Sequence, residues 1–559
     1  MPTLKLRDTY AKQIEPLQLT DAEKRTVTVY TCGPTVYSHA HIGNFRSFLL
    51  GDVLRRTLEL FGLEVRHVMN ITDVGHMTED HLADATGEDK LAKAARELGS
   101  DPFKVASHFT RLFEEDAKAL RLKNYEGAEA ARADLHPRAT AHVPEMLAMI
   151  QTLIERSYAY VDGEGQVYFA VSSFADYGRL SGKVLDELEA GARIAVRSEK
   201  RDPRDFALWK TDRKHLMQWD PHDASGWPPG DFERLQALAP QGIDERVRAG
   251  FPGWHIECSA MSRACLGPII DIHTGGEDNI FPHHECEIAQ SWGARVTEDA
   301  PSSFCRHWVH ARHLLVNGAK MSKRDGTFIT ARDLFDPRGN GREELATALE
   351  AVGFEGGRVP PAVLRFALTS STFSQQMNFT MDALAQAKAS VERLQSLYER
   401  ARDAARDEPA VSEVLELLSG ARTAFDDALA DNLNTARALG EVFQVVSVAN
   451  TRPLSAGDAA AVQAFLERAD EVFAVLDRRV RSGSITRDAL AQRAESVAAG
   501  VDVAGDGTPE ASAILDALAR RFAARRAKDF TRADSIRKTL AARGVDIEDT
   551  SEGVRWRYR

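Results

Sequence analysis

The sequence contains few cysteines: there are five in 559 residues, an odd number spread widely along the chain. A disulfide framework needs a dense, even set, so this pattern excludes the disulfide-stabilised secreted class and indicates a reducing compartment. The N-terminus lacks the apolar core of a signal peptide, and no apolar run is long enough to cross a membrane. We therefore expect a cytoplasmic protein without a membrane partner.

The chain also lacks an excess of positive charge, because 83 acids outweigh 71 lysines and arginines and leave a net charge of −12. Bulk affinity for nucleic acid is not expected, so any contact with RNA must come from a local basic patch. The hydrophobic content of 43% and charged content of 28% are typical of a soluble globular protein. A chain of this length predicts roughly three or four domains.

One stretch, residues 271–290 (DIHTGGEDNIFPHHECEIAQ), concentrates acids and histidines. On a helix that opens after its proline, His283 and Glu287 are four residues apart and share one face. Cys32 and Cys258 lie upstream, and a set of two thiolates, one imidazole and one carboxylate favours zinc. The alternative is that both cysteines are ordinary buried thiols. Spacing alone leaves these two interpretations equally open.

The N-terminal part predicts the start of a doubly wound sheet. Residues 26–30 and 64–69 have strand character, and a helix that begins near Gly43 joins them. Ligands of such folds bind at the carboxyl ends of strands, where Cys32 lies. The HIGN motif, residues 41–44, falls at the helix start, where free N–H groups and the helix dipole favour phosphate. The alternative is a helix cap with a solvated histidine.

A second basic motif, KMSKR at residues 320–324, precedes Asp325-Gly326. Lys320 and Lys323 can clamp a polyphosphate from such a loop, although basic loop residues are often only solvated. The order of the motifs is informative, because HIGN follows the first strand and KMSKR ends a second α/β stretch. Together they predict one sheet that is bracketed by two phosphate-binding motifs.

These motifs resemble those of the class I aminoacyl-tRNA synthetases, and within that class the chain is similar to the cysteinyl-tRNA synthetase family. The matching stretches follow the family order over nearly the whole chain: YTCGPTVYSHAHIGNFRSF, NITD, HPRAT, VYFAVSSFADYGRLSGK, KRDPRDFALWK, FPGWHIECSAMS, FPHHECEIAQS, KMSKR, LRFALTSSTFSQQMNF and KDFTRADSIRKTLAARGVDIEDTSEGVRWR.

The resemblance implies a cysteine–tRNA ligase that uses ATP with Mg²⁺ to form cysteinyl-adenylate and transfers the cysteine to the 3′ end of tRNA(Cys). It implies one Zn²⁺ per chain that binds the substrate thiolate and separates cysteine from serine, and we expect a monomer. The implied metal ligands are Cys32, Cys258, His283 and Glu287. The implied catalytic residues are His41, Lys320 and Lys323, and ATP binding is assigned to Gly33, His41, Gly43, Asn44 and Lys323. Thr72, Trp254, His273 and Asp278 are expected to line the cysteine and adenylate pocket.

The chain departs from the family pattern at several positions. Asn44 replaces the histidine that ends the class motif, and Arg324 replaces the usual serine. Cys286 stands beside Glu287, but an offset of one residue turns it about 100° away on a helix, so we expect a neighbour rather than a ligand. NITD is followed by VGHM instead of an acidic pair and a lysine, a difference that the sequence alone does not explain.

The expected fold is α/β: a Rossmann-like doubly wound parallel sheet with an inserted subdomain, then an α-helical bundle and a small C-terminal α+β domain. The expected divisions are the first half of the catalytic domain (1–126), an inserted acceptor-end subdomain (127–204), the second half with the zinc site and the KMSK loop (205–325, with a surface insertion at 210–250), a stem-contact region (326–385, with a glycine-rich insertion at 336–357), a tRNA-binding helical bundle (386–481), a linker (482–510) and an anticodon-binding domain (511–559). Within the bundle region, helices are predicted over 381–400, 426–450 and 459–480.

The C-terminal piece carries the local basic patch, since residues 520–543 hold nine arginines and lysines against two aspartates. Such a cluster is typical of a surface that meets a phosphate backbone. Trp556 either stacks on an unpaired base or belongs to a small core.

Two rival functions stay open. One is a ligase that passes activated cysteine to the amine of a pseudo-disaccharide in mycothiol synthesis, but such enzymes lack the C-terminal extension. The other is a catalytically silent RNA-binding paralogue, against which the complete set of motifs counts.

Overall fold

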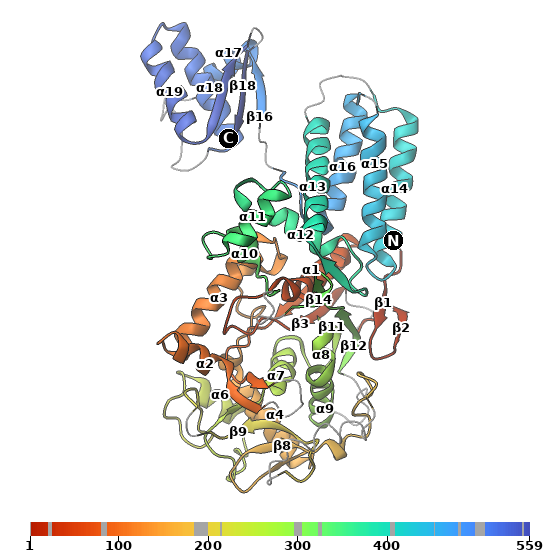
Figure 1. The fold of residues 1–559 in the computed structure, drawn as a ribbon, viewed down its shortest axis with the longest axis vertical. Helices are drawn as coiled ribbons and strands as arrows, with labels where there is room; N and C mark the ends of the chain where they lie inside the picture. The colour runs from red at the N-terminus through yellow and green to blue at the C-terminus, as the bar shows by residue number, and fades with distance from the viewer. Residues whose placement is uncertain are drawn as a thin grey trace. The chain divides into compact units, whose positions relative to one another are not determined.

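The computed structural model describes residues 2–20, 25–79, 86–183, 200–212, 215–295, 304–321, 327–402, 409–451, 453–478, 482–497, 509–550 and 553–558. The chain forms two compact units, Met1–Val475 and Leu476–Arg559, which are described separately (Figure 1). Among the described residues, no helix is both long and apolar enough to span a bilayer.

The first unit is built on a four-stranded parallel sheet in the order β12-β11-β3-β4. Its strands are β3 (Thr26–Thr31), β4 (Glu64–Met69), β11 (Ile270–Gly276) and β12 (Cys305–Ala311). From the β3–β11 pair the chain winds outward to β4 on one side and to β12 on the other. The doubly wound sheet is therefore confirmed, and its topological switch point lies between β3 and β11.

Helix α1 (Ile42–Leu60) connects β3 to β4 and packs on all four strands. Its apolar side chains recur at helical spacing, and Phe45, Leu49, Val53 and Leu58 are fully buried. Helices α7 (Trp254–Leu266) and α9 (Glu285–Gly293) pack on each other, and a π-helical turn, η5 (Ile280–His284), precedes α9.

The inserted subdomain is an antiparallel sheet in the order β10-β9-β8-β7, together with α4 (Val143–Glu155), which packs against α6 (Asp231–Leu238). Its strands are β7 (Ala159–Val161), β8 (Val167–Phe169), β9 (Phe206–Lys210) and β10 (Phe251–Pro252). Phe169 and Phe206 stack with ring centroids 5.1 Å apart. The predicted surface insertion at 210–250 contributes α6, so it is partly helical.

Shorter elements surround the sheet. They are β1 (Lys5–Asp8), β2 (Gln13–Pro16), β5 (Met77–Glu79), β6 (Thr86–Asp89), α2 (Lys90–Glu97), α3 (Pro102–Ala119), α8 (Glu277–Asn279), β13 (Leu314–Val316), β14 (Ala319–Lys320), α10 (Ala331–Phe335), α11 (Glu343–Ala351), α12 (Pro361–Thr369) and β15 (Met377–Phe379). Helix α11 lies inside the segment 336–357 that was predicted as a glycine-rich insertion.

The helical bundle consists of α13 (Met381–Arg402), α14 (Ser412–Ala430), α15 (Thr435–Asn450) and α16 (Ala456–Phe473) (Figure 1). Its existence is confirmed, but one predicted helix, 426–450, is divided. Asn432 and Leu433 have φ of 57° and 49°, a left-handed conformation that a helix interior does not accept. The chain therefore turns there and starts a second, antiparallel helix.

The second unit has an antiparallel sheet in the order β16-β18-β17 with helices α17, α18 and α19. The elements are β16 (Ser482–Thr486), α17 (Arg487–Ser496), α18 (Ala511–Arg526), α19 (Phe530–Ala542), β17 (Val545–Asp549) and β18 (Gly553–Tyr558). Trp556 is 3% exposed and packs with Ile514, Leu518 and Ile536, so it is a core residue. Residues 482–496 are β16 and α17 and not the linker that was predicted, because β16 completes the sheet by pairing with β18.

Candidate functional site

A cavity of 340 Å³ opens at the carboxyl ends of β3 and β11, the switch point of the sheet. Most of the residues that the sequence singled out line it: Cys32, Gly33, His41, Gly43, Asn44, Thr72, Trp254, Cys258, Asp278, His283 and Lys320. They come from segments that are up to several hundred residues apart in the chain. The fold thus gathers the two cysteines, the HIGN motif and the start of the KMSKR motif around one space.

At one end of the cavity, Cys32, Cys258, His283 and Glu287 are all buried, with ligand atoms within 4.8 Å of one another. The two sulfur atoms are 3.9 Å apart, and His283 Nε2 lies 3.0 Å from Glu287 Oε1. His283 belongs to η5 and Glu287 to α9, and the helical backbone is continuous between them after the non-helical Phe281, as the helix predicted after Pro282 requires. The four-residue spacing brings both side chains to the same point.

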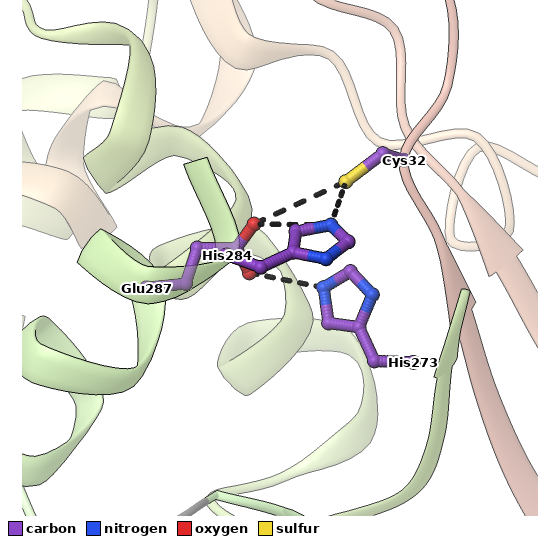
Figure 2. A group of neighbouring side chains, drawn as sticks. All are labelled: Cys32, His273, His284 and Glu287. Carbon is purple, nitrogen blue, oxygen red and sulfur yellow. Dashed lines mark hydrogen bonds and ion pairs between the residues drawn. The ribbon is translucent and has the colours of Figure 1, made fainter. Parts of the chain in front are cut away.

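A second possible tetrad shares Cys32 and Glu287 with the first and adds His273 and His284. Figure 2 shows these four side chains pointing toward one another, with His284 Nε2 3.2 Å from Cys32 Sγ. Cys32 and Glu287 are common to both sets, so an ion that takes all four ligands of one set leaves the other set incomplete. The sets differ in access: Cys32, Cys258 and His283 line the cavity, whereas His273 and His284 do not.

Two histidines outside the first set, His273 of the second set and His255 of neither set, contact its ligands. His273 Nε2 lies 3.0 Å from Glu287 Oε2, the carboxylate oxygen that does not face His283. His255 Nδ1 lies 3.0 Å from Nδ1 of His283, which leaves Nε2 of His283 for a ligand bond. Outer partners of this kind fix the orientation of ligating side chains.

The charges of the cluster suit a metal ion. Burial opposes every charge there, yet Glu287 and Cys258 raise the pKa of His283 to about 10. His273 and His283 likewise outweigh burial and lower the pKa of Glu287 to about 2. The pKa of Cys258 falls to about 6, because its contacts with Cys32 and His283 outweigh burial and the charge of Glu287. At neutral pH the cluster therefore offers one carboxylate and one thiolate in the deprotonated form that metal binding requires. Burial and the neighbouring Cys258 raise the pKa of Cys32, and His283 is protonated, so an ion bound to all four residues would displace the protons of Cys32 and His283.

A third group, Asp8, Glu15 and His307, is also close enough to hold an ion, but its hydrogen bonds argue against it. His307 Nε2 accepts from the Gln18 N–H at 2.8 Å, so the proton of the neutral ring is on Nδ1. Nε2 then accepts a hydrogen bond and Nδ1 carries the proton, so neither nitrogen has a free lone pair for an ion. Asp8 accepts hydrogen bonds from the N–H groups of Tyr10 and Trp308 at 3.0 Å each, so its carboxylate already has a structural role.

The opposite end of the cavity is the start of α1. His41 is the N-cap residue, and its Nδ1 accepts from the Asn44 N–H at 3.1 Å, while Asn44 Oδ1 accepts from the His41 N–H at 3.1 Å. The helix cap and the phosphate interpretations of this motif are thus compatible, because the capped end also lines the cavity. A Cβ on Gly43 would lie 2.6 Å from Met321 Cε, the end of a flexible side chain, and 3.1 Å from the ring of His41, so a side chain there would press on the N-cap residue and narrow the cavity.

At Gly33 the backbone requires glycine, since a Cβ there would lie 1.7 Å from the Asn70 carbonyl oxygen. Its N–H donates to Asn70 Oδ1 at 2.9 Å. Thr72 is fixed beside it, because the Asn70 amide donates to Thr72 Oγ1 at 3.1 Å. These contacts hold the loop after β3 against the loop after β4, and both loops line the cavity.

Lys320 lies at the rim, where its Nζ is 3.1 Å from Asp278 Oδ1 and both side chains are mostly exposed. Lys323 and Arg324 lie outside the described residues. His273 differs from its prediction, because it is fully buried and stacks on Trp308 with centroids 4.6 Å apart. It contacts Glu287 and does not line the cavity.

Several residues at the site were not identified from the sequence. His255 and His284 each adjoin a predicted motif, and their place in WHIEC and PHHEC was the available signal. His76 and Lys90 also line the cavity. His76 follows the NITD motif in the VGHM departure. Cys286 contacts Tyr177 Oη at 3.4 Å and belongs to none of the metal-compatible groups among the described residues.

Family models match three parts of the chain. The model described as tRNA synthetases class I (C) catalytic domain matches residues 18–234 and 239–347. The DALR domain matches residues 424–477, and the cysteinyl-tRNA ligase anticodon binding domain matches residues 506–557. These matches fall on the part of the chain that holds the parallel sheet, on the bundle from the end of α14 to α16, and on the second unit from residue 506.

Curated relatives match over the full length. The chain is 39% identical over 573 residues to the cysteine–tRNA ligase of Salinibacter ruber, covering 100% of this chain and 99% of the relative. It is 38% identical to that of Deinococcus radiodurans, with 100% and 97% covered, and 37% identical to that of a Thermus thermophilus strain, with 99% of each covered. Among solved structures, the LeuRS of Agrobacterium radiobacter K84 in a ternary complex with tRNA and LeuAMS has a TM-score of 0.51 at 12% identity, with 82% and 85% covered, which is a likeness of fold.

Proposed function

The chain belongs to the cysteine–tRNA ligase family of class I aminoacyl-tRNA synthetases and charges tRNA with cysteine, and we propose that it recognises the cysteine thiol with one zinc ion. The ion would be held by Cys32, Cys258, His283 and Glu287. The observation that carries this proposal is that two sulfurs, an imidazole and a carboxylate converge within 4.8 Å at the wall of the cavity.

The donor set fits zinc better than the alternative tetrad. Two thiolates are softer than one thiolate with two imidazoles, and zinc accepts four such ligands or expands to a fifth. Only the first set has three members exposed to the cavity, where a substrate thiol could reach the ion. His273 and His284 would then orient Glu287 and Cys32 from behind.

Zinc would supply the selectivity that pocket shape cannot. Serine differs from cysteine by one atom, and a small difference in size separates two substrates by only about 1–3 kcal/mol. A bound zinc ion prefers a thiolate to a hydroxyl and lowers the pKa of the thiol. No separate editing domain is then required.

The rest of the cavity supports adenylate formation. We propose that the cysteine carboxylate attacks the α-phosphate of ATP, which carries Mg²⁺, and that pyrophosphate leaves. The amide groups at the start of α1, with His41, Gly43 and Asn44, would bind the phosphates, because this helix end attracts anions. Lys320 and Lys323 would stabilise negative charge on the other side. Thr72, Trp254 and Asp278 would hold the amino acid and the adenylate.

In the second step, a ribose hydroxyl at the 3′ end of tRNA(Cys) would attack the adenylate carbonyl and release AMP. The bundle and the second unit support the binding of the rest of the tRNA. In the second unit, Phe530 is 60% exposed at the start of α19, and Arg525, Arg526 and Lys528 precede it. An exposed ring among cations suits an unpaired base and its phosphates. A monomeric, cytoplasmic enzyme completes the proposal.

Zinc content and two activities test the proposal. The purified protein should hold about one zinc per chain and catalyse cysteine-dependent ATP–pyrophosphate exchange and tRNA charging. Cys258→Ser should lose most of the zinc and raise the KM for cysteine by on the order of 10²-fold, with little change in the KM for ATP.

Cys286→Asn is the matched control, since it removes a buried sulfur that lies outside both tetrads, and zinc content should stay near one. Full zinc occupancy in Cys258→Ser would reject the ligand set. Exchange without tRNA charging would favour the pseudo-disaccharide ligase, and the absence of exchange would favour the silent paralogue.

A further inference from the structure

The indole of Trp254 lies between two parallel imidazole rings inside the cavity wall. The ring of His283 stacks on one face, with centroids 4.3 Å apart and planes 20° apart. The ring of His76 stacks on the other face, at 4.4 Å and 15°. Offset stacking at such distances stabilises an aromatic pair beyond simple burial. The proposed zinc ligand His283 is therefore linked to His76 through Trp254.

Both ring nitrogens of His76 are engaged. Lys90 Nζ lies 3.2 Å from Nε2, and because an ammonium group can only donate, Nε2 accepts. Nδ1 then carries the proton and donates to Thr35 Oγ1 at 2.8 Å. Two hydrogen bonds in the plane of the ring fix its rotation, so the face that meets Trp254 cannot turn away.

The backbone delivers His76 to this place. Gly75 has φ of +77°, and a Cβ there would lie 2.6 Å from the Pro252 carbonyl oxygen, so glycine lets the loop approach the segment that leads into α7. The β5–β6 hairpin returns the chain, pairing Met77 with Asp89, and the Lys90 N–H donates to the His76 carbonyl at 2.8 Å. Glycine and hairpin together place His76 against Trp254 and Lys90 against His76.

We propose that His76 is a positioning residue that holds Trp254 against His283 and so fixes the wall of the cysteine pocket. The inference rests on the proposed function, because Trp254 and His283 are residues of its amino-acid site. It gives a role to the VGHM sequence that follows NITD: Gly75 provides the close approach and His76 provides the stacking ring. Loss of this ring would let the indole rotate, and misplacing a substrate-positioning group weakens binding and catalysis.

The test separates the stacking from the hydrogen bonds of His76. His76→Asn keeps a short polar group but removes the ring, and it should raise the KM for cysteine in ATP–pyrophosphate exchange by about tenfold. The KM for ATP and the zinc content should stay at wild-type values. His76→Phe restores a flat ring without polar atoms and should recover most of the lost cysteine affinity. His108→Asn, at an exposed position on α3, is the matched control and should leave both KM values unchanged.

A double-mutant cycle shows whether His76 acts through Trp254. In a Trp254→Ala background, His76→Asn should cause no further rise in the KM for cysteine. Additive effects would overturn the inference, as would equal rises in the KM for ATP, loss of zinc, or His76→Phe behaving like His76→Asn. If the wild type shows normal exchange and His76→Asn has an unchanged KM for cysteine, the inference is overturned and the proposed function stands. Absence of exchange in the wild type overturns the proposed function and this inference with it.

Discussion

At the scale of single residues, the site is a layered arrangement in which the atoms that would touch zinc are held by others that would not. His273 illustrates the outer layer, because its Nε2 contacts the Glu287 oxygen that faces away from His283. Partners of this kind fix the orientation of a ligand. His273 should therefore act on the metal and not on the substrate directly.

His273→Gln should weaken zinc binding by about 10–100-fold, as is typical when an outer partner of a ligand is removed. Competition with a chelator measures this affinity directly. At saturating zinc, the KM for cysteine should return close to the wild-type value. A raised KM with unchanged zinc affinity would mean that His273 contacts the amino acid, as the sequence had suggested.

Most of the residues that the sequence singled out line the cavity, but His273 does not, and the sequence left His76 unexplained. Nearly all of β11 is buried, because both faces of a parallel sheet are covered, so alternation could not reveal which side His273 faces. The role of His76 depends on Lys90, across a hairpin, and on Trp254, in a distant segment. Motif spacing can identify side chains suited to a reaction, but such packing relations arise only in the folded chain.

At the scale of elements, one buried carboxylate joins three helices of the first unit. Asp52 on α1 lies 2.6 Å from Nη2 of Arg365 on α12 and 2.8 Å from Nε of Arg56. Arg56 and Arg365 also donate to backbone carbonyls of α16, at Glu471 and at Phe473. The catalytic sheet and the bundle thus meet at a desolvated ionic cluster.

Asp52→Asn should destabilise the first unit by about 3–5 kcal/mol, because removing one partner leaves buried charge without compensation. Thermal unfolding at neutral pH measures the effect. Glu392→Gln on α13 is the control, since it breaks an exposed i,i+4 pair with Lys388, and such pairs contribute only about 0.3–0.5 kcal/mol. Similar losses in both variants would contradict the role given to Asp52.

The same variant has a defined pH dependence. Burial alone would raise the pKa of Asp52, but the charges of Arg56 and Arg365 outweigh it and hold the pKa well below its usual range. The stabilisation is therefore complete above the unfolded pKa, near about 3.9, and is lost as pH falls through the lower folded value. The difference in unfolding temperature between wild type and Asp52→Asn should be constant near neutral pH and shrink below about pH 4.

Element boundaries were predictable where local periodicity decides them and not where distant contacts do. The strand β4 spans the predicted residues 64–69, because its pattern is local. The break between α14 and α15 is different: the Asn432 N–H donates to the Lys5 carbonyl at 2.9 Å, and Asn432 Oδ1 accepts from the Arg7 N–H at 2.8 Å. A contact across more than four hundred residues leaves no local signal in the sequence.

At the scale of the whole molecule, the adenylation cavity and the basic cluster belong to different units. Every cavity residue lies in Met1–Val475, while residues 520–543 lie in the second unit, which has its own apolar core. A cut near residue 500 would separate β16 from its partner β18 and damage that core. Ending the chain at residue 478 instead removes the whole β16-β18-β17 sheet of the second unit.

This shortened chain should keep ATP–pyrophosphate exchange within about twofold of the full chain, because no group of the adenylation cavity is lost. Its KM for tRNA should rise, and the dependence of tRNA binding on salt should become shallower, since each lost phosphate contact reduces the slope. A change in the tRNA anticodon should reduce charging by the full chain more than by the shortened one. If the shortened chain charges tRNA and discriminates anticodons as the full chain does, then the cations of α18 and α19 do not read the anticodon, and recognition rests on contacts made by the first unit alone.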